Sequence, residues 1–121
     1  MENIFRKYRP EVVLHAAAYK HVPMLEQQPW QAVDNNILGS QVIMEMAVQY
    51  GAAHFVLVST DKAVRPTNVM GASKRISELL LQSFVGNFTQ FVAVRFGNVV
   101  VLPARSFPCS GVRLRKAGPL R

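Results

Sequence analysis

The most informative part of the chain is the run His54-Phe55-Val56-Leu57-Val58-Ser59-Thr60-Asp61-Lys62. Residues 54–58 are mostly apolar, and such a run predicts a buried strand. Two hydroxyls, a carboxylate and an amine follow this run without a break. In an open α/β sheet the carboxyl ends of the strands border the ligand crevice, so we expect the functional site directly after this strand.

Two further apolar runs and two helical patterns surround this strand. The runs over residues 12–14 and 91–101 predict strands. Residues 12–14 show little alternation, which is typical of a strand covered on both faces. Apolar residues recur at steps of three and four over residues 30–50, with Gly51 as the stop, and again over residues 71–84.

The expected order of elements is therefore β-α-β-α-β. Strands that alternate with helices predict parallel pairing and right-handed crossovers in an α/β fold. A dinucleotide-binding domain usually opens with a strand, a GxGxxG turn and a helix whose N-terminus binds the pyrophosphate, and the sequence contains no such motif. We expect a partial Rossmann-like parallel sheet over residues 1–101 that lacks this first dinucleotide-binding unit.

Length and composition are those of a small globular domain. The chain has 121 residues, of which 50% are hydrophobic and 17% are charged, and this balance excludes a disordered chain. No apolar run approaches the ~20 residues that a membrane-spanning helix needs. The first ten residues carry charge instead of an apolar signal core, and the one cysteine, Cys109, fits a reducing compartment. We expect a cytoplasmic protein without a membrane segment.

The net charge of +7 suggests a nucleic-acid partner, but the distribution of the charge argues against one. Residues 1–101 hold nine Lys or Arg and seven Asp or Glu, a net of +2, whereas residues 102–121 hold five Lys or Arg and no acid, a net of +5. Helical periodicity is also lost in this last segment. We expect no nucleic-acid partner, and an atypical basic tail over residues 102–121 that is not native to the fold.

Five motifs follow one another between Pro10 and Val99. They are HAAAYKHVP at 15–23, NILG at 36–39, VSTDKA at 58–63, GASK at 71–74 and VRFGNV at 94–99. Each is weak alone, but the five in this order are specific. Together they resemble the nucleotide-sugar 4,6-dehydratases of bacterial polysaccharide biosynthesis, a branch of the extended short-chain dehydrogenases.

The resemblance implies a reaction and three catalytic side chains after the central strand. Family members oxidise C4 of a UDP-N-acetylhexosamine with NAD or NADP, eliminate water across C5 and C6, and return the hydride to C6. By position, Thr60 would hydrogen-bond the sugar O4, Asp61 would protonate the leaving C6 hydroxyl, and Lys62 would be the base at C5. Adjacent acid and base residues suit this task because elimination needs both on one substrate.

The resemblance also implies the residues that bind the cofactor. Ala16, Ala17 and Ala18 would line it after the first strand. Asn36 would belong to the structural and cofactor-facing helix. Lys74 would hold the nicotinamide ribose and belong to the catalytic set.

Met70 stands four residues before Lys74, where ordinary short-chain dehydrogenases carry a tyrosine. A thioether cannot accept and relay the proton of the C4 hydroxyl, so Lys74, a water or a group outside the chain would take it. The large membrane-anchored members that make capsule or O-antigen precursors share this methionine. By the same resemblance, Lys20 and Asn98 would face the sugar or its diphosphate.

Relative to that family, the chain lacks the first unit and the substrate domain. We expect a truncated fragment that is inactive or weakly active and binds NAD(P) weakly. One alternative is a nucleotide-sugar epimerase fragment, which shares the fold but normally keeps the tyrosine. Another is a non-catalytic interaction remnant whose long helix, residues 33–50, binds a partner; family members commonly form homodimers through such helices.

Single residues also have plain structural interpretations. Lys74 by itself would suit a solvated helix face, and Asp61 would suit a cap or a turn. His15, at a strand end, is expected to be packed and hydrogen-bonded, not catalytic. Trp30 is expected in the core.

Overall fold

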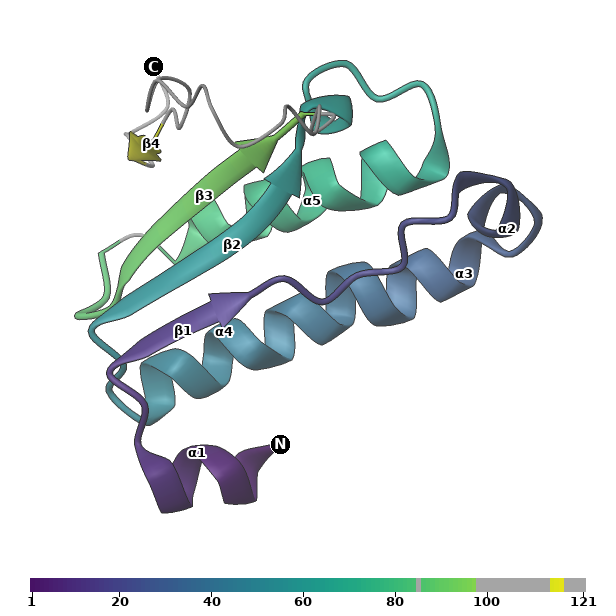
Figure 1. Ribbon diagram of the computed structural model, residues 1–121. Helices are drawn as coiled ribbons and strands as arrows, with labels where there is room; N and C mark the ends of the chain where they lie inside the picture. Colours follow the sequence, from purple (N-terminus) through teal and green to yellow (C-terminus); the bar gives the residue numbers. More distant parts are fainter. Residues whose placement is uncertain (85, 98–113, 117–121) are drawn as a thin grey trace, which may run out of the picture.

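Three parallel strands form the middle of the molecule: β1 (Val12–His15), β2 (His54–Thr60) and β3 (Gln90–Phe96). The structure is a computed structural model and describes residues 1–84, 86–97 and 114–116. A short strand, β4 (Leu114–Lys116), pairs antiparallel with β3, so that the order across the sheet is β1-β2-β3-β4 (Figure 1). The expected β-α-β-α-β order and parallel pairing are confirmed.

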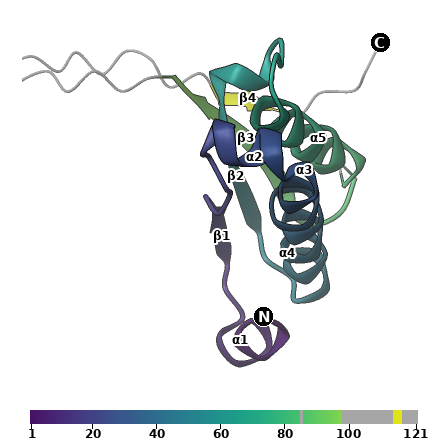
Figure 2. The ribbon, with the colours of Figure 1, turned by 90° about the vertical axis from the view of Figure 1, so that its right-hand side faces the viewer.

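The two long helices cover one face of this sheet. Helix α4 (Gly39–Gln49) precedes β2 and helix α5 (Val69–Ser83) precedes β3, and both lie on the same side of the strands (Figure 2). The core forms between them, where the rings of Phe55 and Phe91 lie 5.3 Å apart between their centroids. Other buried side chains of this core are Phe5, Met44, Ala47, Leu57 and Leu81.

The opposite face of β1 is open among the described residues. Leu14 is 72% exposed and Val12 is 50% exposed, so the two-sided cover predicted for this strand is absent from the described part of the chain. The cause is that α4 and α5 share one side of the sheet.

Residues 29–49 form one continuous helical segment in which the helix type changes. It begins as α3 (Pro29–Gln31), widens into a π-helix, η1 (Ala32–Leu38), and continues as α4. Gly51 follows with a φ of 72°, a left-handed conformation that glycine adopts without steric cost. Trp30, expected in the core, is 58% exposed, because this end of the helical segment extends beyond the end of β1 (Figure 1).

Two short helices complete the first part of the chain. Helix α1 (Glu2–Tyr8), which the sequence pattern did not predict, buries Phe5 in the core. Helix α2 (Val22–Gln27) follows the loop after β1 and buries Leu25. Leu25 packs with Met70 in a second, smaller apolar cluster. This cluster holds α2 against the beginning of α5.

The elements around the expected site have slightly different bounds from the predicted ones. A single 3-10 turn, η2 (Asp61–Ala63), follows β2 directly. Helix α5 begins two residues before the predicted start, because Asn68 caps it: Gly71 N donates to Asn68 Oδ1 at 2.8 Å. The third strand was predicted to reach residue 101, and residues 98–101 lie outside the described residues.

Candidate active site

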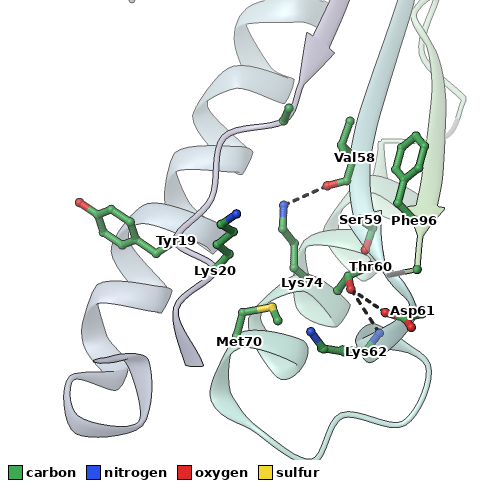
Figure 3. A pocket seen from close by; sticks show the side chains of 12 residues that line it. Tyr19, Lys20, Val58, Ser59, Thr60, Asp61, Lys62, Met70, Lys74 and Phe96 are labelled. Carbon is green, nitrogen blue, oxygen red and sulfur yellow. Dashed lines mark hydrogen bonds between the residues drawn. The ribbon is translucent and has the colours of Figure 1, made fainter. Parts of the chain in front are cut away.

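A pocket of about 490 Å³ lies at the carboxyl ends of β2 and β3 (Figure 3). The loop after β1 forms one wall and the first turns of α5 form another. The lining residues are Ala16, Tyr19, Lys20, Val58, Ser59, Thr60, Asp61, Lys62, Met70, Lys74, Phe96 and Gly97. Its place is the one that the sequence predicts, because parallel strands end at the same edge of the sheet.

The strand register explains why the loop after β1 reaches this pocket. His15, the last residue of β1, pairs with Leu57, whereas β2 continues to Thr60, which pairs with Phe96. The chain after His15 therefore leaves the sheet earlier and runs beside the last residues of β2. This brings Ala16 and Lys20 to the same pocket as Thr60.

Thr60, Asp61 and Lys62 share the turn that follows β2. Thr60 Oγ1 donates to Asp61 Oδ1 at 3.0 Å and accepts from Lys62 N at 3.4 Å. Strand geometry, which alternates faces, stops at Thr60. The 3-10 turn then lets both Asp61 and Lys62 line one pocket. The cap of this turn is therefore Thr60 and not Asp61, whose carboxylate borders the cavity.

Lys74 is a buried ammonium on the inner face of α5. It is 7% exposed, and its Nζ donates to Val58 O at 3.0 Å (Figure 3). The interpretation of Lys74 as part of a solvated helix face is therefore wrong. Burial lowers the pKa of Lys74, and the charge of Glu78 opposes this effect.

Met70 lies one helical turn before Lys74 and also lines the pocket. It is 5% exposed and packs with Leu25 and Ala32. Its side chain therefore supplies an apolar wall where an ordinary short-chain dehydrogenase would present a phenol. The ring of Tyr19 is directed away from the pocket in Figure 3.

Gly71 has a packing role that the sequence motif alone did not indicate. A Cβ at this position would lie 2.6 Å from the carbonyl oxygen of Lys62. Only glycine permits this close approach between the first turn of α5 and the turn that carries Asp61 and Lys62. In the sequence, the only sign of this contact was the glycine three residues before Lys74.

Asn36 lies beneath the pocket, not in its wall. Its side chain is fully buried and binds both backbone groups of Tyr19, accepting from Tyr19 N at 2.8 Å and donating to Tyr19 O at 3.1 Å. Its amide also donates to Ser73 Oγ at 2.9 Å. Asn36 thus ties the loop that carries Lys20 to the helix that carries Lys74.

The π-helix η1 presents the backbone of Asn36 to two hydroxyls. The carbonyl oxygen of Asn36 accepts hydrogen bonds from Ser40 and Ser77. π-Helical turns within α-helices are frequent at functional sites. The sequence placed Asn36 on the correct helix, but the apolar periodicity could not indicate that this part of it is a π-helix.

His15 is packed and hydrogen-bonded, as expected. Its Nε2 lies 2.9 Å from Ser40 Oγ. Since Ser40 donates its hydrogen to Asn36 O, the imidazole must be the donor in this pair, which assigns the proton to Nε2. Burial and then the charge of Lys74 lower the pKa of His15, so the ring is neutral near pH 7.

Glu78 is a buried acid behind the pocket that the sequence motifs did not single out. Arg95 binds it through two bonds, Nε to Oε1 at 2.8 Å and Nη2 to Oε2 at 2.6 Å. Arg75 Nη1 donates to Oε2 at 3.1 Å. Burial alone would raise the pKa of Glu78, but the hydrogen bonds, led by those of Arg95, outweigh it and lower the pKa.

The remaining predicted site residues have different positions. Ala17 and Ala18 lie in the loop after β1 beside Ala16, but only Ala16 is among the lining residues of the pocket. Asn98 lies outside the described residues. Among the described residues there is no cluster of three or more His, Cys, Asp or Glu side chains placed to hold a metal ion.

A known protein family matches most of the chain. The family described as "Polysaccharide biosynthesis protein" matches residues 1–107. The chain belongs to this family. It is 47% identical to the probable polysaccharide biosynthesis protein EpsC of Bacillus subtilis over 122 residues, which cover 99% of this chain and 20% of EpsC. The chain therefore spans about a fifth of the length of this relative.

Two further proteins relate the family to sugar nucleotides. The chain is 39% identical to a UDP-N-acetylglucosamine 4,6-dehydratase (inverting) of Campylobacter jejuni, over 74% of this chain and 28% of that protein. A UDP-glucose 4-epimerase of Thermus thermophilus, solved in complex with NAD, superposes with a TM-score of 0.73 at 28% identity, over 78% of this chain and 36% of that one. These matches show a partial Rossmann-like fold of the dehydratase and epimerase group.

Proposed function

We propose that the chain carries the catalytic segment of a sugar-nucleotide 4,6-dehydratase, a lyase of capsule or lipopolysaccharide biosynthesis. The observation that carries this proposal is the turn after β2, where Asp61 and Lys62 border the same pocket as Lys74. An elimination needs an acid and a base on one substrate. The pocket wall holds three lysines and one carboxylate, and this excess of positive charge suits the diphosphate of a UDP-N-acetylhexosamine.

The side chains around Lys74 fit a nicotinamide cofactor, NAD or NADP. Ala16 follows β1 with a one-carbon side chain that leaves room beside the buried ammonium. In our proposal Ala16, Ala17 and Ala18 line the cofactor, and Lys74 donates to the nicotinamide ribose. A cofactor bound by these residues would supply hydride transfer, from C4 of the sugar and back to C6.

The elimination then uses the three residues of the turn. Lys62 removes the proton from C5, while Asp61 protonates the leaving C6 hydroxyl. The C5–H and C6–O bonds break, a double bond forms between C5 and C6, and water leaves. The Thr60 hydroxyl hydrogen-bonds O4, and Lys20 and Asn98 bind the sugar or its diphosphate.

Met70 separates this proposal from its alternative, a UDP-sugar 4-epimerase. The likeness to the NAD-bound epimerase structure favours the alternative. However, epimerisation at C4 does not need the neighbouring acid and base, Asp61 and Lys62. The methionine also offers no hydroxyl for C4, so in the dehydratase a water takes the C4 hydroxyl proton.

The test uses an EpsC chimera in which this chain replaces the matching segment. Asp61→Asn removes the acid, and Lys62→Met removes the base while keeping much of its apolar stem. Each should lower conversion of UDP-N-acetylglucosamine to the 4-keto-6-deoxy product by ~10² to 10⁴. Met70→Leu is the matched control and should have a mild effect. A C4 epimer as the only product would support the epimerase, and near-full rates for both first variants would contradict the assigned roles.

We also propose a homodimer, and a cytoplasmic place for the reaction. Four apolar side chains of the helical layer, Val33, Val42, Ile76 and Leu79, are between 42% and 46% exposed. Two of them belong to the helical segment 33–50 and two to α5, which packs beside it. Sedimentation of the chain and of Val42→Lys tests this surface: the variant should shift a dimer toward monomer. Among the described residues no helix is long and apolar enough to cross a membrane.

A further inference from the structure

Glu78 is a buried charge close to the pocket for which the proposed reaction has no use. It is 4% exposed and lies four residues after Lys74 on α5, so the two side chains share a helix face. Three hydrogen bonds from Arg95 and Arg75 bind its two carboxylate oxygens. A buried carboxylate with two cationic partners is ionised, and it carries its negative charge into the region below the pocket.

Arg95 connects this carboxylate to the edge of the site. It lies on β3 and pairs in the strand register with Ser59, which lines the pocket. The next two residues of the chain, Phe96 and Gly97, line the pocket as well. The ion pair between Arg95 and Glu78 therefore fixes this wall relative to α5, the helix that carries Lys74.

The charges around Lys74 are predominantly positive. Arg75 and Glu78 lie on its own helix, and the others come from the loop after β1, η2 and β3: Lys20, Asp61, Lys62 and Arg95. His15, at the end of β1, is neutral near pH 7. The two carboxylates are Asp61, which is exposed, and Glu78, which is buried. Water screens a buried charge least, so Glu78 has the stronger effect on a buried ammonium.

We propose that Glu78 is a positioning residue of the pocket: anchored by Arg95, its carboxylate keeps Lys74 an ammonium at the end of β2, where Val58 O accepts from it. The carboxylate opposes the burial that lowers the pKa of Lys74. Without this charge, nothing on the same face of α5 would oppose the effect of burial on Lys74. The effect of Glu78 on the charge of Lys74 is independent of the proposed function. Only its expected effect on turnover rests on the proposed function.

The first test measures the titration of Lys74 directly in the chain. Lysine labelled with ¹³C at Cε is followed by NMR as the pH rises, and the signal is assigned with Lys74→Arg. Glu78→Gln should shift the Lys74 midpoint downward, because an attraction is lost and two cations remain. Arg75→Gln is the matched control from the same cluster; it removes a cation and should shift the midpoint upward. An unchanged midpoint in Glu78→Gln would overturn the proposal.

Two further variants keep the test decisive if Glu78→Gln does not fold. Arg95→Gln leaves the carboxylate less compensated and should raise the Lys74 midpoint, as Arg75→Gln should. If both midpoints stay at the parent value, Glu78 does not control Lys74. Glu78→Asp keeps the charge and should restore a midpoint near that of the parent.

Turnover in the EpsC chimera separates this inference from the proposed function. If the ammonium of Lys74 is needed, activity is lost as the pH rises through the Lys74 midpoint, and Glu78→Gln should move this loss to lower pH. A midpoint shift by NMR in a chimera that does not dehydrate UDP-N-acetylglucosamine would support the role of Glu78 and refute the proposed function. A moved pH profile without an NMR shift of Lys74 would refute the role of Glu78.

Discussion

Gly71→Ala tests whether the close approach of α5 positions the catalytic turn. In the structure a Cβ at Gly71 would lie 2.6 Å from the carbonyl oxygen of Lys62 and 3.3 Å from its carbonyl carbon. Contacts of a Cβ below 3.0 Å essentially never occur. The distance of 2.6 Å to the carbonyl oxygen is 0.4 Å below this limit of 3.0 Å. Either α5 or the backbone of Lys62 must therefore move by at least 0.4 Å.

Two opposing terms set the size of the effect. Inserting a methyl group into a packed site costs typically ~1–3 kcal/mol. Replacing glycine by alanine inside a helix stabilises the folded state by roughly 0.5–1 kcal/mol. The clash dominates, so we expect a net loss of up to about 2 kcal/mol in the free energy of unfolding. A displaced Lys62 should also lower turnover about tenfold, since misplacement by ~1 Å can cost ~10².

Gly39→Ala is the matched control for this experiment. Its Cβ would lie 3.5 Å from Asp34 O, an ordinary contact, and the backbone at Gly39 is helical with a φ of −58°. This variant should be more stable than the parent by roughly 0.5–1 kcal/mol. Urea unfolding of the chain measures both variants, and the EpsC chimera measures turnover. If Gly71→Ala gains as much stability as Gly39→Ala and keeps full turnover, the reasoning is refuted.

Four other predictions concern the network under the pocket, the core, the cofactor and a buried histidine. Asn36→Ala should cost about 2–4 kcal/mol in urea unfolding, because it leaves buried partners of the amide unpaired; a loss below that of an exposed Asn→Ala change would contradict this role. Phe55→Ala should cost ~3–5 kcal/mol in the same assay, and a near-neutral result would place Phe55 outside the core. Calorimetric titration of the chain with NAD and NADP should give weak binding, since it has no Gly-rich turn; micromolar affinity would contradict this expectation. Because the folded-state pKa of His15 is depressed from 6.5, its contribution to stability is present above that value and is lost as the pH falls through the folded pKa. His15→Gln should therefore flatten the acid dependence of unfolding, and an unchanged slope would contradict the assignment.

The position of the site was predictable from local patterns. The apolar run before Ser59 indicated a strand, and helical spacing on both sides indicated parallel pairing. The polar residues after such a strand must lie at its carboxyl end, so Thr60, Asp61 and Lys62 were placed correctly. Lys74 was placed by its motif, although its burial was not visible in the sequence.

Several expectations failed where a local pattern cannot contain the answer. The apolar run in β1 suggested cover on both faces. In the described residues Leu14 is exposed, because both long helices lie on the same side of the sheet. Trp30 is exposed because its helix extends past the strand that would cover it. Both outcomes depend on how elements are arranged in space, and hydrophobicity along the chain does not specify this arrangement. The origin of the basic tail stays a prediction, and β4 is the part of it that the structure describes.

Three features could be predicted from the chain alone: the α/β class, the order of the strands and helices, and the stretch that carries the candidate acid and base. These features depend on periodicity and on residues close together in the chain. Only the tertiary structure decided that Asn36 joins the Tyr19 loop to α5, with its partner Ser73 37 residues away, and that Glu78 meets Arg95 across 17 residues. It also decided that Gly71 must be small to let Lys62 approach. The physical reason is that hydrogen bonds, ion pairs and steric limits act through space, so they exist only once folding has brought distant segments together.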